Sequence, residues 1–197
     1  MTVRLPAAQR RAQLLRTALD EFGAKGYHGT SMNDIAEAAG VTKPVLYQHF
    51  ESKDELFLAV MRDVGDRLWE TIDAAASAAN GPREQVDGGF AAYFAFFAHQ
   101  PAAFNVLFGG GAGIDPSFLA EADRIGTAIS EHIADFLHDV DPAVRFTLAA
   151  AVVGLSERAM GRWMREGRPG EPADIAKTVA DLAWFGLRGA PGAERSP

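Results

Sequence analysis

The 197-residue chain contains no cysteine, and it lacks several other features that mark particular classes of protein. Without thiolates it has no disulfide framework, no cysteine nucleophile and no cysteine ligand for a metal. It also lacks an excess of basic charge, because 19 Lys and Arg stand against 26 Asp and Glu, for a formal net charge of −7. That balance argues against a protein that coats nucleic acid through general positive charge.

Long hydrophobic runs are missing too. Residues 88–114 contain no Asp, Glu, Lys or Arg, but Pro101 and several polar residues interrupt them. The continuous apolar part, Gly88 to Ala98, is about half of a membrane span, which favours a buried helix. Charges also break the apolar run near the N-terminus every few residues. We therefore expect no export signal and a cytoplasmic location.

Sequence patterns of common enzyme classes are absent as well. His132 and His138 are six positions apart, whereas two ligands on one helix face are four apart, and no His-Glu-x-x-His pattern occurs. The glycine-rich segment 109–113 lacks the Lys-Ser/Thr of a phosphate-binding loop. There is no nucleophile elbow and no dinucleotide fingerprint. We expect no catalytic residues, no metal and no cofactor.

No segment alternates apolar and polar residues in the way that predicts a strand. Glycine and proline instead divide the chain into helical segments, so the sequence predicts an all-α protein of about nine helices. The expected segments are about Ala7 to Ala24, 31–39, 43–49, Lys53 to about Ala79, 83–99, 101–108, 116–138, 142–167 and 172–188. Residues 189–197 are expected to be a disordered tail.

Charge is unevenly distributed along the chain. Residues 1–50 carry a net charge of +2, and the remainder carries −9. A basic end on an acidic body is expected when only that end meets a polyanion, although ordinary surface variation also produces such a difference.

Residues 26–56 predict two short helices joined by a tight turn. Thr30 or Ser31 caps the first helix, and Gly40 suits the left-handed position that ends it. Thr42 caps the second helix, whose first turn tolerates Pro44. The first helix has an apolar stripe formed by Met32, Ile35, Ala36 and Ala39. This is a helix-turn-helix, whose second helix can lie in the major groove of DNA.

A specific set of spaced residues lies between about Arg11 and Phe57. It comprises Ala18, Phe22, Gly26, Tyr27, Thr30, Ser31, Asp34, Ile35, Ala36, Ala39, Gly40, Val41, Leu46, Tyr47, His49, Phe50, Ser52, Lys53, Glu55 and Leu56. This pattern resembles the DNA-binding domain of the TetR (tetracycline-repressor) family of bacterial transcriptional regulators. One departure is Pro44, because its position is often Gly in that family.

The resemblance implies an organisation and a function. Residues 1–53 are expected to form a helix-turn-helix DNA-binding domain, and 54–188 a ligand-binding and dimerisation domain. The implied function is that of a homodimeric repressor that binds a palindromic operator and is released by a small inducer. A small-molecule-binding helical dimer with little or no DNA binding is the alternative.

Candidate DNA contacts follow from the same motif. We expect base reading by Lys43, Val45 and Gln48, because these side chains can meet guanine, the thymine methyl and adenine. At the start of the second helix, Thr42 and Lys43 can meet phosphate, and the alternative for Thr42 is a simple cap. The resemblance implies further phosphate contacts from Tyr47, His49 and Lys53; for Tyr47 the alternative is packing between helices. Phe22, Ile35, Leu46 and Phe50 are expected in the core. The full candidate set is Thr30, Ser31, Thr42, Lys43, Pro44, Val45, Tyr47, Gln48, His49 and Lys53.

An aromatic stripe marks the middle of the chain. Phe90, Tyr93, Phe94 and Phe97 are spaced so that they share one helix face, which is typical of an ordinary core. The family resemblance implies an inducer pocket in this region, and the lack of a charged cluster favours an apolar or aromatic ligand. The candidate ligand-binding residues are Trp69, Phe90, Tyr93, Phe94, Phe97, His99, Phe104, Asn105 and Phe108.

Two late helices have apolar stripes that favour a homodimer. In the resembled family, the last two helices of each subunit build a four-helix interface, and these stripes fit that arrangement. Burial within one subunit is the alternative. The candidate interface residues are Val144, Leu148, Ala151, Leu155, Ala159, Ile175, Val179 and Leu182.

Overall fold

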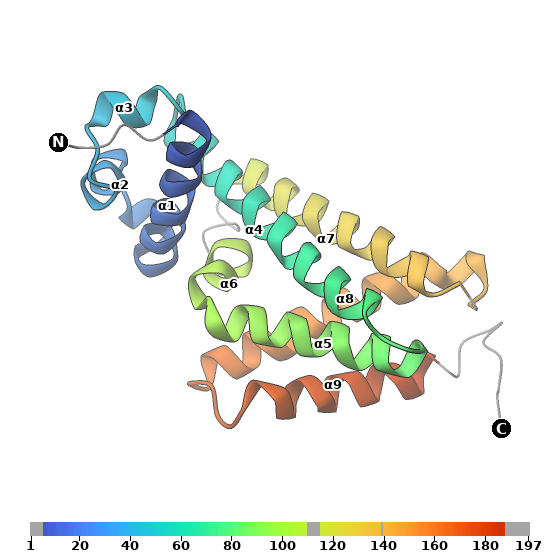
Figure 1. The fold of residues 1–197 in the computed structure, drawn as a ribbon. Coiled ribbons are helices and arrows are strands. Elements are labelled where there is room, and N and C mark those ends of the chain that lie inside the picture. Colours follow the sequence, from blue (N-terminus) through green and yellow to red (C-terminus); the bar gives the residue numbers. More distant parts are fainter. Residues whose placement is uncertain (1–5, 110–114, 139, 188–197) are drawn as a thin grey trace. The chain divides into compact units, whose positions relative to one another are not determined.

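The computed structural model describes residues 6–109, 115–138 and 140–187, and all regular secondary structure in these ranges is helical (Figure 1). The predicted all-α class is confirmed. The helices are α1 (Ala7–Gly29), α2 (Met32–Ala38), α3 (Lys43–Tyr47), α4 (Lys53–Ser77), α5 (Pro82–His99), α6 (Pro101–Phe108), α7 (Pro116–Phe136), α8 (Pro142–Arg165) and α9 (Pro172–Leu187). Within the described ranges, no helix combines the length and apolar character needed to span a membrane.

The chain divides into two compact units by its internal contacts. We call residues 1–65 with 100–122 the head unit, and residues 66–99 with 123–197 the body unit. The helices α4 and α7 each begin in the head unit and end in the body unit, whereas α6 lies wholly in the head unit. These contact-based units differ from the segments 1–53 and 54–188 expected from sequence. The expected segments are divisions by function, and they stay a prediction. The expected tail, 189–197, lies outside the described residues.

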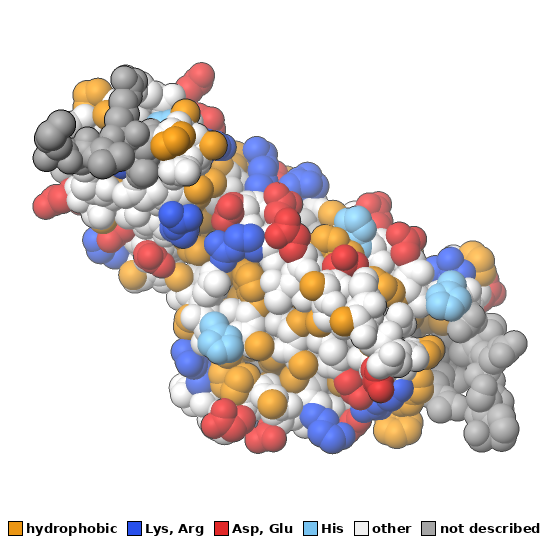
Figure 2. Space-filling model, in the orientation of Figure 1, with side chains coloured by type: hydrophobic (Ala, Val, Ile, Leu, Met, Phe, Trp, Pro, Cys, Tyr) orange, Lys and Arg blue, Asp and Glu red, His pale blue; other side chains and the backbone are white. Residues whose placement is uncertain are grey.

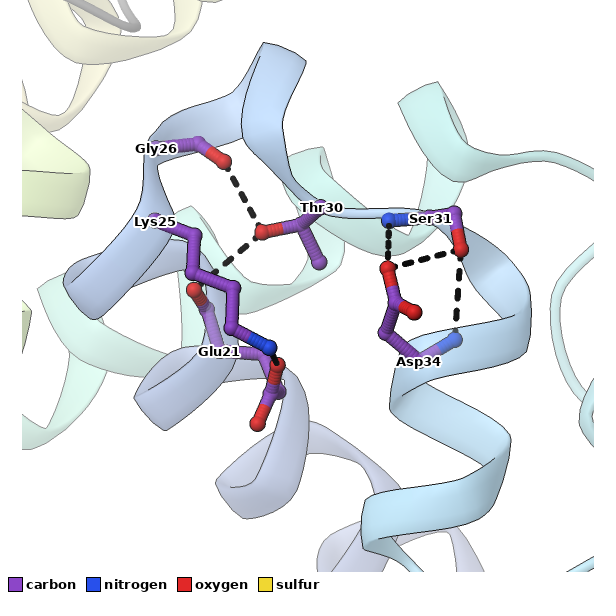
Figure 3. Close-up of polar contacts among 6 residues, drawn as sticks. All are labelled: Glu21, Lys25, Gly26, Thr30, Ser31 and Asp34. Carbon is purple, nitrogen blue, oxygen red and sulfur yellow. Dashed lines mark hydrogen bonds and ion pairs between the residues drawn. The ribbon is translucent and has the colours of Figure 1, made fainter.

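The end of α1 differs from its expected position near Ala24. Backbone hydrogen bonding continues to Gly29, but Gly26 interrupts the helical geometry with φ 72° and ψ 169°. Glycine adopts this positive φ without the steric penalty that a Cβ would add. The hydroxyl of Thr30 donates to the carbonyl oxygens of Gly26 and Glu21, at 2.9 and 3.1 Å (Figure 3). Thr30 thereby ties two carbonyl groups of α1 together at the kink.

The core of the head unit includes apolar side chains from its first four helices and from the link between α3 and α4. The expected core residues Phe22, Ile35, Leu46 and Phe50 are all at most 2% exposed, which confirms their assignment. The ring of Phe57 meets that of Phe22 edge-on at 5.0 Å between centroids, and Phe118 of α7 lies 4.7 Å from Phe57. The beginning of α7 is therefore part of the head unit's core.

Helix α6 packs directly on α1. The side-chain amide of Asn105 donates to the carbonyl of Gly23 at 3.0 Å. A second link in the head unit joins α4 to α7, where the guanidinium of Arg62 donates two hydrogen bonds, of 3.0 and 3.1 Å, to the carboxylate of Glu121. Glu121 is only 7% exposed, so this paired geometry compensates for burying its charge.

In the body unit, α5 and α9 pack side by side (Figure 1). The small residues Ala176 and Ala180 of α9 are almost fully buried. On α5, Phe94 and Phe97 are both 0% exposed. Arg83 of α5 pairs with Asp181 of α9 and lies over the ring of Trp184, which links the two helices at their charged surface.

Candidate nucleic-acid interface

The turn between α2 and α3 has the geometry that a helix-turn-helix requires. Gly40 takes φ +65°, and the N–H of Val41 donates to the carbonyl of Ala36 at 2.9 Å. This arrangement ends α2 within one residue of its expected end and lets the chain reverse into α3. Ser31 caps α2: its side chain accepts from the N–H of Asp34, whose carboxylate accepts from the N–H of Ser31 (Figure 3).

Helix α3 presents most of its side chains outward. Leu46 is 0% exposed and anchors the helix to the core of the head unit. Lys43, Pro44 and Gln48 are exposed, and Val45 is half-buried. These residues were expected to contact DNA. Tyr47, which was expected to do so as well, is 43% exposed. That exposure argues against the alternative in which Tyr47 packs between helices.

Beside α3 the surface forms a concave site of about 400 Å³. Side chains and backbone from the end of α1, the start of α2, α3 and the start of α4 converge on it. Its lining residues are His28, Gly29, Thr30, Ser31, Met32, Asn33, Asp34, Lys43, Tyr47 and Lys53. Two lysines, a phenol, a histidine and an amide side chain around one hollow form a set of donors suited to an anion.

Lys53 has a structural role in addition to any contact with DNA. Its ammonium group donates to the carbonyl oxygens of Tyr27 and Thr30, at 3.0 and 3.1 Å. It also lies 4.1 Å from the centroid of the Tyr27 ring, in a cation–π contact. Two of its three N–H groups are thus used within the protein, so at most one donor remains for a phosphate.

Tyr27 fixes the start of α4 to the end of α1. Its hydroxyl donates to the carboxylate of Asp54. Burial, followed by the hydrogen bond to the Asp54 carboxylate, raises the pKa of the Tyr27 phenol above its ordinary value. The phenol therefore stays protonated and remains a donor across the physiological range.

The comparisons with known proteins agree with this geometry. The model of the tetR family of bacterial regulatory proteins matches residues 14–60. The chain is 30% identical over 191 residues to the transcriptional activator FasR of Mycolicibacterium smegmatis, an HTH-type protein, covering 95% of this chain and 87% of that one. The chain belongs to the TetR family.

Solved structures support the same assignment. A TetR-like transcriptional regulator from Rhodococcus sp. RHA1 is 31% identical, with a TM-score of 0.76 over 94% of this chain and 100% of that chain. The fatty acid degradation regulator FadR from Bacillus halodurans has a TM-score of 0.80 over 95% of this chain and 99% of that chain. At 16% identity, the FadR likeness shows the fold alone. The protein is a transcriptional regulator of the TetR type, with an N-terminal helix-turn-helix.

One expected DNA contact, Thr30, and one expected cap, Thr42, need correction. Thr30 is 2% exposed, and its hydroxyl is engaged by the α1 carbonyl groups, so its side chain is not presented to DNA. Thr42 is the N-cap of α3 by position, but its side chain makes no capping hydrogen bond. The hydroxyl of Thr42 is therefore not engaged as a cap, and the residue is exposed.

The remaining candidates lie around α3. Ser31 is exposed at the start of α2, and His49 is half-buried just after α3. Arg11 of α1 was not among the candidate DNA contacts. Its guanidinium lies 4.4 Å from the centroid of the Phe50 ring and donates to the backbone carbonyl of His49. His28 and Asn33 were also missed, because nothing in their spacing distinguishes them from other polar residues in the same motif.

The expected ligand-binding residues fall into both units. Phe90, Tyr93, Phe94 and Phe97 lie in the body unit and are at most 8% exposed, and Trp69 of the body unit stacks on His132 at 4.4 Å between ring centroids. His99 also belongs to the body unit and is exposed at the end of α5. The other three candidates, Phe104, Asn105 and Phe108, belong to the head unit. The amide of Asn105 is engaged by α1.

Tyr93 differs from the other aromatic side chains of α5. Its hydroxyl is buried and has no hydrogen-bond partner within the part of the chain that the structure describes. Burial raises the pKa of this phenol above its ordinary value, with a smaller contribution from the charge of Glu157 on α8. A buried, unsatisfied hydroxyl is costly, which makes Tyr93 the strongest polar candidate in the aromatic stripe.

The expected dimer residues differ in their exposure. Leu182 of α9 is 61% exposed. Val144, Leu148, Leu155, Ala159 and Ile175 are half-buried, and Ala151 is exposed. Val179 is only 6% exposed in the single chain, so burial within the protomer leaves it almost no surface to offer a partner.

Two exposed phenylalanines were not among the expected dimer residues. Phe146 of α8 is 46% exposed and Phe185 of α9 is 70% exposed. Phe185 lies three positions after Leu182, so both occupy one face of α9. Elsewhere, on the face drawn in Figure 2, hydrophobic side chains over α5 and α9 are scattered among charged ones, as on an ordinary soluble surface. The combination on α8 and α9 therefore stands out as a candidate contact with another chain.

Proposed function

We propose that this protein is a homodimeric, ligand-responsive regulator that binds a palindromic DNA operator through α3 and the concave site beside it. The observation that carries the proposal is the outward presentation of Lys43, Tyr47 and Gln48 next to a hollow lined by further donors. Exposed side chains of a recognition helix read base edges, while the flanking donors hold the phosphate backbone.

In this proposal the side chains divide into two functions. Lys43, Val45 and Gln48 read bases in the major groove. Ser31, Tyr47, His49 and Lys53 contact the backbone and set the register of α3, with Thr42 and Pro44 at the helix start close to the DNA.

The DNA-binding part is tested by selecting duplexes from a random library with the purified protein and sequencing those retained. We expect an inverted repeat whose half-sites lie one helical turn, or a multiple of a turn, apart, because two α3 helices of a dimer must reach successive major grooves about 34–36 Å apart. A matched variant, Gln48→Ala with Lys43→Ala, should retain no common sequence. Failure of the wild-type protein to be retained by any duplex at low salt would favour the alternative, a ligand-binding helical dimer with little or no DNA binding.

We further propose that the DNA-bound dimer represses transcription by occupying a promoter. One relative over about half of this chain, KstR2 of Mycolicibacterium smegmatis, is a repressor, whereas the relative over nearly the whole chain, FasR, is an activator. Transcription in vitro from a promoter that contains the selected operator separates the two modes. Less transcript on adding protein is expected, and more transcript would overturn repression while leaving operator binding intact.

A small ligand, largely apolar, is proposed to bind in the body unit. The aromatic stripe of α5 supplies apolar contacts, and the unpartnered hydroxyl of Tyr93 would donate to a single polar group of the ligand. A thermal-shift screen with linear and aromatic alcohols, amides and carboxylic acids tests this. Compounds that raise the melting temperature of the wild type but not of Tyr93→Phe would support the assignment, and hits unaffected by Tyr93→Phe would contradict it.

Release from DNA is proposed to pass through α4 and α7, since each of these helices has residues in both units. A ligand shifts the balance between DNA-binding and non-binding states only by its difference in affinity for the two states. A tenfold loss of operator affinity needs about 1.4 kcal/mol. By thermodynamic linkage the operator must weaken ligand binding by the same factor. Calorimetric titration of a screened ligand with and without operator should show this, and equal affinities would exclude control of DNA binding by that ligand.

A further inference from the structure

His28 lines the concave site but belongs to none of the positions that the helix-turn-helix motif assigns to DNA. It lies in the last turn of α1 and is exposed. The ring of Tyr27 meets it edge-on, with 5.1 Å between the centroids. Across the hollow stand α3 and the beginning of α4. The imidazole is therefore on the surface of a site that already collects donors for an anion.

One carboxylate, that of Asp34, also lines this site and opposes an anion. On α1, Lys25 is paired with Glu21, and on α2 the carboxylate of Asp34 is held by Ser31 (Figure 3). Hydrogen bonds from Ser31 lower the pKa of Asp34, so it is ionised at neutral pH and opposes a phosphate. The other ionisable side chains that line the hollow are Lys43 and Tyr47 of α3 and Lys53 of α4. Asp54 of α4 and Asp115, which precedes α7, act on the adjacent Tyr27.

Lys53 has at most one N–H group left for a phosphate. Its ammonium group donates to two backbone carbonyl groups and lies against the Tyr27 ring. Lys43 is on the exposed start of α3, where base reading is proposed. A further donor in the hollow would therefore strengthen phosphate binding, and the exposed imidazole of His28 is such a donor.

We propose that His28 is a further DNA-phosphate contact and that its protonation couples DNA affinity to pH. This inference rests on the proposed DNA-binding function and deepens it. A phosphate beside the imidazole favours the protonated form, which donates through both ring nitrogens. DNA binding then takes up a proton at this site, so affinity for DNA rises as the pH falls through the range of about 8 to 6.

The test uses a short random-sequence duplex, because a phosphate contact does not depend on sequence. Fluorescence anisotropy gives the dissociation constant at several pH values, at low salt, for the wild type, His28→Gln and His138→Gln. His138 is an exposed histidine of the body unit and serves as the matched control. We expect His28→Gln to weaken binding by about tenfold near pH 6, as for loss of a hydrogen bond to a charged group, with little effect near pH 8.5.

Salt dependence gives a second measurement. Near pH 6 the slope of log affinity against log salt should be smaller by roughly 0.9 in His28→Gln than in the wild type, as for the loss of one phosphate contact. His138→Gln should match the wild type in both slope and pH profile. An unchanged pH profile in His28→Gln would overturn the inference, as would a profile that is lost in His49→Gln instead.

The two levels of failure are distinguishable. A wild type that binds no duplex at any pH overturns the proposed DNA-binding function and this inference together. A wild type that binds DNA with no contribution from His28 overturns only the inference. If His28→Gln does not fold, proton NMR of the wild-type histidine ring signals decides: the pKa of the His28 signal must rise when duplex DNA is added, and no change would contradict the proposal.

Discussion

Gly23 of α1 and Ala102 of α6 touch so closely that a Cβ atom added to Gly23 would lie 2.3 Å from the Cβ of Ala102 and 2.6 Å from its Cα. The second of these atoms is backbone, so no rotation of a side chain can relieve the overlap. The same glycine accepts the hydrogen bond of Asn105 through its carbonyl. The absence of a side chain at Gly23 is therefore what allows α6 to join the head unit.

Gly23→Ala should destabilise the protein, because either α6 must move away or the two helices must overpack. We expect a loss of about 1–3 kcal/mol in the free energy of unfolding, measured by urea denaturation. Gly126→Ala in α7 is the matched control, since a Cβ there has nothing within 4 Å. The control should gain up to about 1 kcal/mol from helix propensity. Equal effects of the two substitutions would show that the α1–α6 contact is not close in solution.

Removing the hydroxyl of Tyr47 should weaken DNA binding without changing sequence preference. Tyr47→Phe deletes one donor to a charged phosphate on the exposed side of α3, which is worth about 1.5 kcal/mol or more, or roughly tenfold or more in affinity. Filter binding with the selected operator and with an unrelated duplex should show the same factor for both. A loss confined to the operator would mean that Tyr47 reads a base.

Gln48 should behave in the opposite way. Gln48→Ala removes an amide that can pair with adenine, so one position of the selected sequence should lose its preference at a cost of about 1–3 kcal/mol. Binding to unrelated duplexes should stay nearly constant. Repeating the random-library selection with the variant is the measurement, and recovery of an unchanged consensus would remove Gln48 from the base-reading set.

A charge on α9 should dissociate the proposed dimer. Leu182 and Leu119 are exposed to a similar extent, 61% and 59%, but only Leu182 belongs to the proposed interface. Leu182→Glu should therefore give a monomer at micromolar concentration, because burying an unpaired carboxylate is costly, whereas Leu119→Glu should leave the mass unchanged. Light scattering measures both. A monomeric wild type, or dimers in both variants, would be incompatible with this interface.

The capping box of α2 should give a pH-dependent contribution to stability. Hydrogen bonds from Ser31 lower the folded-state pKa of Asp34, so the unfolded chain binds its proton more tightly. The stabilisation is fully present above the unfolded value of about 3.9 and is lost as the pH falls through the folded pKa. The melting temperature of the wild type should therefore exceed that of Asp34→Asn at neutral pH, and the difference should shrink below about pH 4. A difference that stays constant down to pH 3 would contradict the assignment.

The sequence alone determined the helices and the helix-turn-helix, because the sequence signals for both are local. Proline and glycine set the helix limits within a few residues, and the Ser31–Asp34 and Gly40 positions specify a capped helix and its turn through their own backbone neighbours. The apolar spacing that placed Leu46 and Phe50 in the core was likewise sufficient. These features depend on residues three or four positions apart, where one chain segment carries the whole pattern.

Tertiary structure alone decided which of these helices pack together and which polar groups remain available. Periodicity gives the buried face of a helix but not the partner that buries it, so the joining of α6 to α1 through Gly23 could not be read from spacing. The engagement of Thr30 and Lys53 by carbonyl groups of α1 also depends on how chain segments meet. The same holds for His28, which becomes a candidate only because α1, α2, α3 and α4 line one open hollow. The sequence shows which side chains can form hydrogen bonds, but only the fold determines whether protein groups or DNA can reach them.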